Sequence, residues 1–353
     1  MSLFNPKSAK QSFIGVDLGA SGIKLVELLN EKSRARLQTY AYVEIPSKDR
    51  AYFEDAKKTG ELLKQVVAKA KCTTKKAISA LPAPAVFSSI ISVAALKDQE
   101  FEAAVYAQAK KLVPMPIEEV VIDYKKIELE EDGDGKKINR VLITAAPKTL
   151  VARYTEIFKV AELELTSLET EIFALVRALI GKDRSTIMIV DIGSQRTNIM
   201  VIERGIPFLT RSIATGGVAI TENIAKTLGL SFAEADSMKR DIRSLQSFAP
   251  AGEIKPILEA LLKPIADEVR YTFNLYQEQA QDGKPKKVDK IILTGGSVLL
   301  PRLPEFMTEL LNVNAYLGDP WARVIYPPGL RPILDDIGSR FSVAMGCAMR
   351  DIE

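Results

Sequence analysis

The chain of 353 residues contains no histidine, and this absence excludes several kinds of active site at once. Without an imidazole there can be no Ser-His-Asp triad, no histidine general base and no His-ligated zinc. Cysteine is nearly absent too, because Cys72 and Cys347 are the only two in the sequence and they lie far apart. Two distant cysteines are too few for a metal cluster and indicate a reduced, cytosolic protein.

An excess of one charge and a long apolar run are also missing. The formal net charge of +3 is small for this length and gives no electrostatic reason to expect nucleic acid as the main partner. Residues 77–96 are uncharged over the length of a transmembrane helix, but Pro82, Pro84 and four serines within them predict two strands joined by a proline-rich turn. The first residues have no long apolar core, so we expect neither a signal peptide nor a membrane span.

What the sequence does contain is three glycine turns, each at the end of an apolar run, within residues 14–24, 189–197 and 291–297. Glycine lets backbone N–H groups approach a phosphate, and an aspartate directly before such a turn can hold Mg²⁺ or its waters. Two Asp-X-Gly turns, one in each of two domains, would hold the phosphates of a nucleotide from opposite sides. The Gly-Gly turn would then receive the adenosine. This arrangement resembles the actin, Hsp70 and sugar-kinase superfamily.

These turns and two later segments supply the candidate nucleotide-binding residues. They are Asp17, Gly19, Ala20, Ser21, Lys24, Asp191, Gly193, Ser194, Thr197, Gly216, Gly217, Asp236, Lys239, Arg240, Gly295, Gly296 and Ser297. Asp17 and Asp191 are the candidates for facing Mg²⁺, directly or through water. Each alone fits a turn residue that caps local N–H groups equally well. The presence of both, followed by the Gly-Gly turn, favours the cleft.

The remaining candidates keep plainer alternatives. Spacing alone favours an exposed strand position for Lys24. The loop before Gly217 fits the capped start of a helix as well as a backbone lining a cleft. Asp236 and Lys239 fit a solvated charge pair on a helix, or ribose and purine contacts together with Arg240. The sequence has neither a P-loop nor a G-x-G-x-x-G turn after a strand.

The length suffices for two domains with a core each, and the hydrophobic patterning predicts related halves. A hairpin of two strands is expected over 12–29, further strands over 36–43, 87–94, 120–129, 137–146, 186–191, 197–202 and 290–293, and helices over 54–70, 98–111, 149–161, 231–245 and 254–279. An apolar strand, an Asp-X-Gly turn and a second strand occur in both halves. This recurrence predicts two related domains about a cleft.

Five longer blocks support a closer resemblance, at 101–124, 140–148, 173–179, 210–217 and 345–350. Together they resemble the type IV pilus assembly protein PilM family in nearly the whole chain, and more distantly the cell-division protein FtsA. The resemblance implies an α/β, actin-like (Hsp70/FtsA-type) two-domain fold with a central nucleotide cleft and an FtsA-type extra subdomain. The implied subdomains are 1A (12–84 and 164–184), 1C (85–163), 2A (185–220 and 286–353) and 2B (221–285).

The resemblance also implies ATP and Mg²⁺ in the cleft and a partner, PilN, whose cytoplasmic tail docks against the first domain. The chain would then be cytoplasmic and recruited to the inner face of the inner membrane. Two residues depart from the family pattern, because Asp236 stands in place of a glutamate and Glu169 in place of an aspartate. A role for Glu169 or Glu171 at the cleft floor therefore stays open. Unlike FtsA, the sequence shows no C-terminal amphipathic helix, so we expect no direct membrane insertion.

The expected function is a nucleotide-sensitive adaptor with slow ATP hydrolysis. Gln195 and Glu171 are the candidates for orienting the attacking water, although Gln195 could simply satisfy its turn and Glu171 could simply begin a helix. An FtsA-like filament protein is the first alternative, disfavoured by the missing C-terminal helix and the Pro-Met-Pro block at 114–116. A small-molecule kinase is the second, but the sequence offers no separate acceptor pocket with a carboxylate base.

Overall fold

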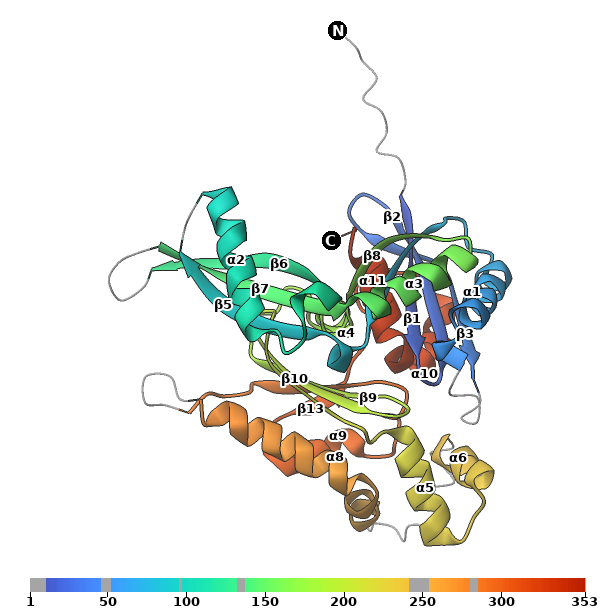
Figure 1. Ribbon diagram of the computed structural model, residues 1–353. Helices are drawn as coiled ribbons and strands as arrows, with labels where there is room; N and C mark the ends of the chain where they lie inside the picture. Colours follow the sequence, from blue (N-terminus) through green and yellow to red (C-terminus); the bar gives the residue numbers. More distant parts are fainter. Residues whose placement is uncertain are drawn as a thin grey trace.

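The structure is a computed structural model that describes residues 11–45, 52–94, 97–131, 137–240, 254–279 and 285–352. Two large sheets form the two halves of the molecule, and a small third sheet projects beside the first (Figure 1). The first sheet has the strand order β14-β3-β2-β1-β4-β8. Its strands are β1 Ser12–Gly19, β2 Gly22–Asn30, β3 Ala35–Glu44, β4 Lys76–Leu81, β8 Glu164–Thr170 and β14 Val324–Ile325.

The second sheet repeats the topology of the first, with the order β11-β10-β9-β12-β13. Its strands are β9 Ile187–Ile192, β10 Thr197–Glu203, β11 Ile206–Ile213, β12 Lys290–Thr294 and β13 Ala315–Leu317. In each sheet three antiparallel strands are followed by two strands that lie parallel to the first one. The recurrence in the sequence is thus confirmed as a structural repeat.

The third sheet has the order β5-β7-β6 and corresponds to the inserted segment expected after the first strands. It comprises β5 Phe87–Ala94, β6 Val120–Glu131 and β7 Lys137–Pro147, and α2 Asp98–Leu112 packs on it. Phe101, Val105 and Ala109 recur at helical spacing and are buried against this sheet. The prolines shortly after Leu112 cannot continue the helix, so α2 ends there.

Helices cover the outer faces of both large sheets. α1 Ala56–Ala70 and α3 Lys148–Val160 pack on the first sheet, and α5 Gly217–Leu228, α6 Phe232–Arg240, α8 Ile254–Gln277 and α9 Leu303–Leu311 belong to the second half. Asp55 caps α1 by accepting a hydrogen bond from the N–H of Lys58 at 3.0 Å. α6 is the beginning of the helix expected over 231–245, whose last residues lie outside the described ranges.

A central layer lies between the two sheets. It contains α4 Glu171–Leu175, a π-helical turn Val176–Ile180, α10 Arg331–Ile337, a 3₁₀ turn Gly338–Phe341 and α11 Ser342–Met349. Alternate residues of β9 face opposite sides, so Ile187 and Ile189 pack toward this layer while Met188 and Val190 pack toward the helices of the second half. All eight residues of α11 are buried, as expected for a helix with no polar face.

The C-terminal segment departs from the subdomain boundary implied by the resemblance. Residues 286–353 were expected in 2A, but β14 pairs in parallel with β3 at Ala35 and Arg36. α11 also lies directly on β1, because a Cβ added at Gly15 would meet the carbonyl oxygen of Ala344 at 1.9 Å. Because α11 has no polar face, it needs cover on all sides, which the space between the two sheets provides.

The uncharged run at 77–96 is built as expected from strands. It contains most of β4, the 3₁₀ turn Ala83–Ala85 and β5. Within the described ranges, no helix has the length and apolar character that a membrane span requires.

Candidate nucleotide-binding cleft

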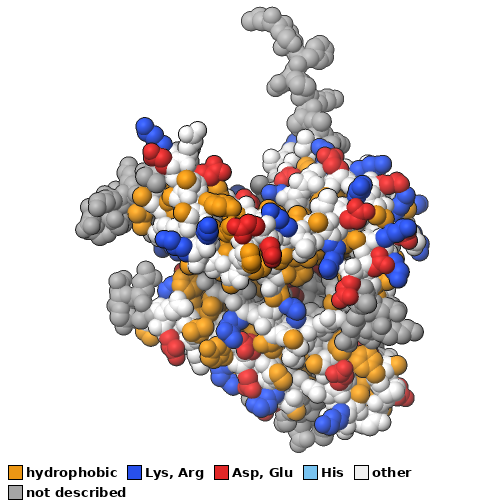
Figure 2. Space-filling model, viewed as in Figure 1, with side chains coloured by type: hydrophobic (Ala, Val, Ile, Leu, Met, Phe, Trp, Pro, Cys, Tyr) orange, Lys and Arg blue, Asp and Glu red, His pale blue; other side chains and the backbone are white. Residues whose placement is uncertain are grey.

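A cleft of about 1160 Å³ lies between the two large sheets, where the surface in Figure 2 is recessed. The β1–β2 turn, the β9–β10 turn and the turn after β12 all border it. Most of the candidate residues line it: Asp17, Gly19, Ala20, Ser21, Lys24, Glu171, Asp191, Gly193, Ser194, Gln195, Gly217, Asp236, Lys239, Gly295, Gly296 and Ser297. The structural repeat explains why these residues lie together, because β1 and β9 occupy equivalent positions and end at the same cleft.

Lys24 is buried beside Asp17 rather than exposed on a strand. The two residues are cross-strand partners in β1 and β2, and the distance from Lys24 Nζ to Asp17 Oδ2 is 3.2 Å. Only 8% of Lys24 is accessible. The expectation of an exposed position was wrong because both faces of β2 are covered, one by α11 and the other by the core under α1 and α3. Gly19 leaves room for the ammonium, since a Cβ there would lie 2.7 Å from Nζ.

Asp191 holds the equivalent place in the second sheet but has a neutral cross-strand partner, Asn198. Burial, reinforced by the negative charge of Asp17, raises the pKa of Asp191 to about 6. A hydrogen bond from Asn198 opposes this shift without cancelling it. Asp191 therefore carries a charge that the protein compensates incompletely.

Glu171 is a third carboxyl group at the cleft. It begins α4, and its Oε2 accepts hydrogen bonds from the N–H of Ala83 at 3.0 Å and from Nδ2 of Asn198 at 3.4 Å. Burial and then the charge of Asp191 raise the pKa of Glu171 to about 8. Both sequence interpretations of Glu171, a helix start and a cleft residue, thus apply to the same side chain.

Glu169 lies elsewhere, and the structure answers the question left open for it. Its two carboxylate oxygens accept hydrogen bonds from Arg177 at 2.6 and 2.8 Å, and Arg350 lies 3.9 Å away. Arg177 also donates to the carbonyl oxygen of Gly346 in α11. Glu169 of β8 is therefore linked through Arg177 to α11, and it does not line the cleft.

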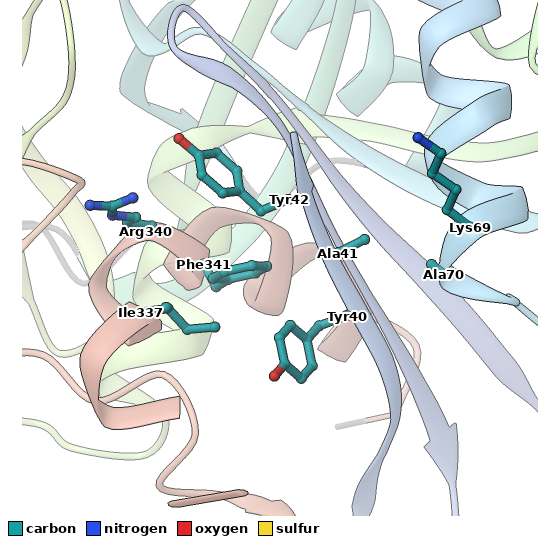
Figure 3. A pocket seen from close by; sticks show the side chains of 8 residues that line it. All are labelled: Tyr40, Ala41, Tyr42, Lys69, Ala70, Ile337, Arg340 and Phe341. Atoms are coloured by element: carbon teal, nitrogen blue, oxygen red, sulfur yellow. The ribbon is translucent and has the colours of Figure 1, made fainter. Parts of the chain in front are cut away.

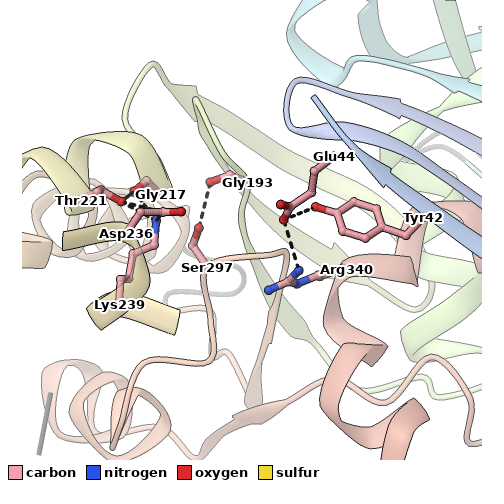
Figure 4. Close-up of polar contacts among 9 residues, drawn as sticks. All are labelled: Tyr42, Glu44, Gly193, Gly217, Thr221, Asp236, Lys239, Ser297 and Arg340. Carbon is pink, nitrogen blue, oxygen red and sulfur yellow. Dashed lines mark hydrogen bonds and ion pairs between the residues drawn. The ribbon is translucent and has the colours of Figure 1, made fainter. Parts of the chain in front are cut away.

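Close backbone packing joins the second turn to the start of α5. The N–H of Gly217 donates to the carbonyl oxygen of Gly193 at 2.9 Å, and Ser297 Oγ donates to the same oxygen at 3.4 Å (Figure 4). A Cβ atom added at Gly216 would lie 2.6 Å from the carbonyl oxygen of Gly193. One added at Gly217 would lie 2.1 Å from Ser297 Oγ. Gly216 and the fully buried Thr197 do not line the cleft. These two candidates therefore have a supporting role in this packing and do not face the cleft.

The two glycines of the third turn have different requirements. Gly295 has φ +99° and a Cβ there would lie 2.4 Å from the carbonyl oxygen of Ile192, so only glycine fits. At Gly296 the nearest heavy atom to an added Cβ is Cγ of Arg340, at 3.8 Å. The space before Gly296 is therefore open to the cleft.

Asp236 and Lys239 of α6 form a partly buried network instead of a solvated pair. Lys239 Nζ lies 3.0 Å from Asp236 Oδ1 and donates to the carbonyl oxygen of Gly217 at 2.8 Å and to Thr221 Oγ1 at 2.5 Å (Figure 4). This network fastens α6 to the first turn of α5. The side chain of Arg240 lies outside the described part of the chain.

Several residues that line the cleft were not among the candidates, and Asn198 and Arg340 are two of them. Asn198 follows Asp191 by the same spacing that separates Lys24 from Asp17, so the repeat itself could have revealed it. Arg340 comes from the 3₁₀ turn before α11, faces Gly296, and lies 3.8 Å from Glu44, whose Oε1 accepts a hydrogen bond from Tyr42 (Figure 4). No local motif marks Arg340, because its position depends on the crossing of the C-terminal segment.

The carboxyl groups fit a divalent cation held mainly through water. Asp17, Glu171 and Asp191 bring three carboxyl groups to a cleft in which Lys24 compensates Asp17. Among the described residues, no three acidic, cysteine or histidine side chains are arranged to hold a metal directly. Mg²⁺ commonly retains several waters and uses one or two carboxylates together with substrate phosphates.

Comparison with known proteins gives the family. The model of the family described as type IV pilus assembly protein PilM matches residues 15–352. A solved PilM–PilN type IV pilus biogenesis complex is 25% identical, with a TM-score of 0.80 over 96% of this chain and 98% of that chain.

More distant structures share the fold alone. The ethanolamine utilization protein EutJ from Carboxydothermus hydrogenoformans is 16% identical, covers 96% of this chain and 89% of its own, and has a TM-score of 0.56. MreB5 of Spiroplasma citri bound to ADP is 14% identical, with coverages of 95% and 94% and a TM-score of 0.51. The fold is thus the actin-like ATPase fold, and the chain belongs to the PilM family of type IV pilus assembly proteins.

Proposed function

We propose that this protein binds ATP with Mg²⁺ in the cleft and serves as a nucleotide-sensitive adaptor in type IV pilus assembly. Its partner would be the cytoplasmic tail of a PilN-like inner-membrane protein, which would recruit it to the inner face of that membrane. One observation carries the nucleotide part of this proposal. Asp17 and Asp191 border one cleft from equivalent turns of two repeated sheets.

The residues of the cleft suggest a division of labour. Asp17 and Asp191 would hold Mg²⁺ through its waters, and the ion would neutralise phosphate charge. Lys24, already 3.2 Å from Asp17, would add a fixed positive charge beside the phosphates. The open space before Gly296 would receive the adenosine. Asp236 would accept from ribose hydroxyls, while Lys239, whose ammonium already donates to Gly217 and Thr221, would shape the rim.

Slow hydrolysis is part of the same proposal. A general base must be unprotonated to take a proton from water, and burial raises the pKa of Glu171 to about 8. Gln195 lines the cleft but is an amide and can only orient a water molecule. At neutral pH most Glu171 would therefore be protonated and Gln195 has no basic group, so hydrolysis would be slow and partner docking would be the main output.

The adaptor part depends on a difference between two states. A ligand shifts a two-domain equilibrium only when it makes different contacts in the two arrangements. A nucleotide held from both sheets would make such a difference, because closure brings both aspartate turns to the same phosphates. The similarity to the PilM–PilN complex along nearly the whole of both chains supports a PilN-like tail as the partner.

The test is tail-peptide binding and ATP turnover in the same preparation. A fluorescent peptide of the cytoplasmic tail of a PilN-like protein should bind, and its Kd should change by at least about threefold between ATP·Mg²⁺ and no nucleotide, which corresponds to at least about 0.65 kcal/mol. Single-turnover hydrolysis without the peptide should be far slower than a typical enzymatic rate of about 10 s⁻¹. Turnover at that rate, or peptide affinity indifferent to nucleotide, would overturn the adaptor function.

A further inference from the structure

Along most of its length, the outer edge of β3 pairs with no strand of the described chain. β2 pairs with the inner edge from Ala35 to Glu44, whereas β14 pairs with the outer edge only at Ala35 and Arg36. Beyond Arg36, no described strand covers this edge. An unpaired strand edge is a template for another extended chain, and proteins usually blunt or cover it.

The direction of the backbone groups can be followed along β3. The N–H of Ile45 donates to the carbonyl oxygen of Ser21 on the β2 side at 3.0 Å. This direction alternates along an antiparallel strand. The backbone N–H and C=O of Ala41 therefore also point to β2, whereas those of Tyr40 point to the outer edge. The irregularity in the pairing occurs only beyond Thr39, so it does not disturb the alternation up to that point.

A pocket of about 310 Å³ surrounds the same stretch of β3 (Figure 3). Its lining is Tyr40, Ala41, Tyr42, Lys69, Ala70, Ile337, Arg340 and Phe341. The aromatic and aliphatic side chains lie on one side of the strand, and the last turn of α1 lies on the other (Figure 3). Side chains that alternate along an added strand would therefore meet an apolar surface on one face and α1 on the other.

Two cations give this pocket a charge preference. Lys69 is exposed and has no carboxylate partner among the described residues. Arg340 lies 3.8 Å from Glu44, and its buried Nε finds no hydrogen-bond partner within the described chain. A carboxylate on the incoming segment would satisfy Lys69 or a remaining donor of Arg340, whereas a lysine there would be repelled.

We propose that the free edge of β3 binds an extended, acidic segment of another protein, which adds to the first sheet as a strand in line with β14. Backbone hydrogen bonds at Tyr40 would supply binding energy that is independent of sequence. The apolar side of the pocket and Lys69 would supply specificity. This site lies on the opposite edge of the first sheet from β8 and does not require nucleotide in the cleft.

The probe is a fluorescein-labelled peptide of about eight residues, the length of an ordinary strand. Valine and threonine alternate along it, and glutamate occupies two of its positions. It should bind the full chain with a Kd below about 1 mM. It should also slow hydrogen exchange at Tyr40. The same sequence with all amides N-methylated should not bind, because it cannot donate to the sheet.

Charge reversal tests the acidic preference. Lys69→Glu should weaken peptide binding by at least about tenfold, and a peptide with lysines in place of the glutamates should prefer this variant. Lys226→Glu is the matched control, since Lys226 is an exposed lysine in the last turn of α5 just as Lys69 is in α1. The control should bind like wild type. Failure of the unmethylated peptide to bind, equal binding of the N-methylated peptide, or an unaffected Lys69→Glu variant would each overturn the proposal.

Discussion

The two aspartate turns have the same place in two repeated sheets but different electrostatics. Asp17 faces Lys24 across its strand pair, whereas Asp191 faces Asn198 at the same spacing. The first turn thus contains a buried ion pair. The second contains a carboxyl group whose pKa burial and the charge of Asp17 raise to about 6. The repeat therefore keeps an aspartate in both turns but changes its cross-strand partner from lysine to asparagine. This change leaves negative charge in the cleft for a cation to compensate.

The largest expected effect comes from removing the positive partner in the first turn. Lys24→Met would leave Asp17 buried without its cation, which should lower the free energy of unfolding by roughly 3 kcal/mol. Urea denaturation at pH 7 measures this loss. Lys263→Met removes one partner of an exposed pair with Asp267 and should cost less than about 1 kcal/mol. Equal losses of unfolding free energy in the two variants would show that breaking the buried Asp17–Lys24 pair costs no more than breaking an exposed pair.

The raised pKa values predict a pH dependence of stability without nucleotide. Between the ordinary carboxyl pKa, near 4, and about 8, the native state binds more protons than the unfolded state. The free energy of unfolding should therefore fall as the pH rises from 5 to 8. Glu171→Gln removes one of the two titrating groups and should make this fall smaller. The change in unfolding free energy is about 1.4 kcal/mol for each unit by which folding shifts the pKa of the removed group. Thermal unfolding of both proteins across this range measures it, and identical slopes would contradict the assignment.

The third turn offers a sharper separation between folding and binding. Gly296→Val should fold normally, because an added Cβ meets nothing closer than Cγ of Arg340 at 3.8 Å, yet it should weaken ATP binding by at least about tenfold. Gly295→Ala should instead destabilise the protein by about 1–3 kcal/mol, since φ is +99° and a backbone oxygen stands in the way. Calorimetric titration and thermal unfolding of both variants separate the two effects. A folded Gly296→Val protein with wild-type ATP affinity would show that the adenosine does not lie there.

The smallest expected effect belongs to the rim of the cleft. Lys239→Ala removes the donor that joins Asp236 to Gly217 and Thr221, so α6 should lose its fixed place beside α5. We expect ATP affinity to fall by about threefold, or less than 1 kcal/mol. Calorimetric titration checks this value, and a loss as large as that of Gly296→Val would indicate direct contact between Lys239 and the nucleotide.

Much of this arrangement was predictable from local sequence. Asp17 and Asp191 stand at the ends of apolar strands before glycines, and such turns specify their own conformation. The burial of Lys24 was not predictable in this way, because it depends on α11 covering β2 from the far end of the chain. Arg340 reaches the cleft for the same reason, since the C-terminal segment crosses from the second half to the first. Asn198 could have been found by applying the spacing of the first turn to the second.

The most direct test of the account is calorimetric titration of ATP·Mg²⁺ into the wild-type protein and into Asp17→Asn and Asp191→Asn. Asp335→Asn serves as the control, because Asp335 pairs with Arg331 on the exposed surface and is absent from the cleft lining. Circular dichroism confirms that each variant is folded. If the two turns act together, each cleft variant should bind at least about tenfold more weakly, a loss of about 1.4 kcal/mol, while the control is unchanged. Wild-type affinity in both cleft variants would contradict a nucleotide held from both sheets.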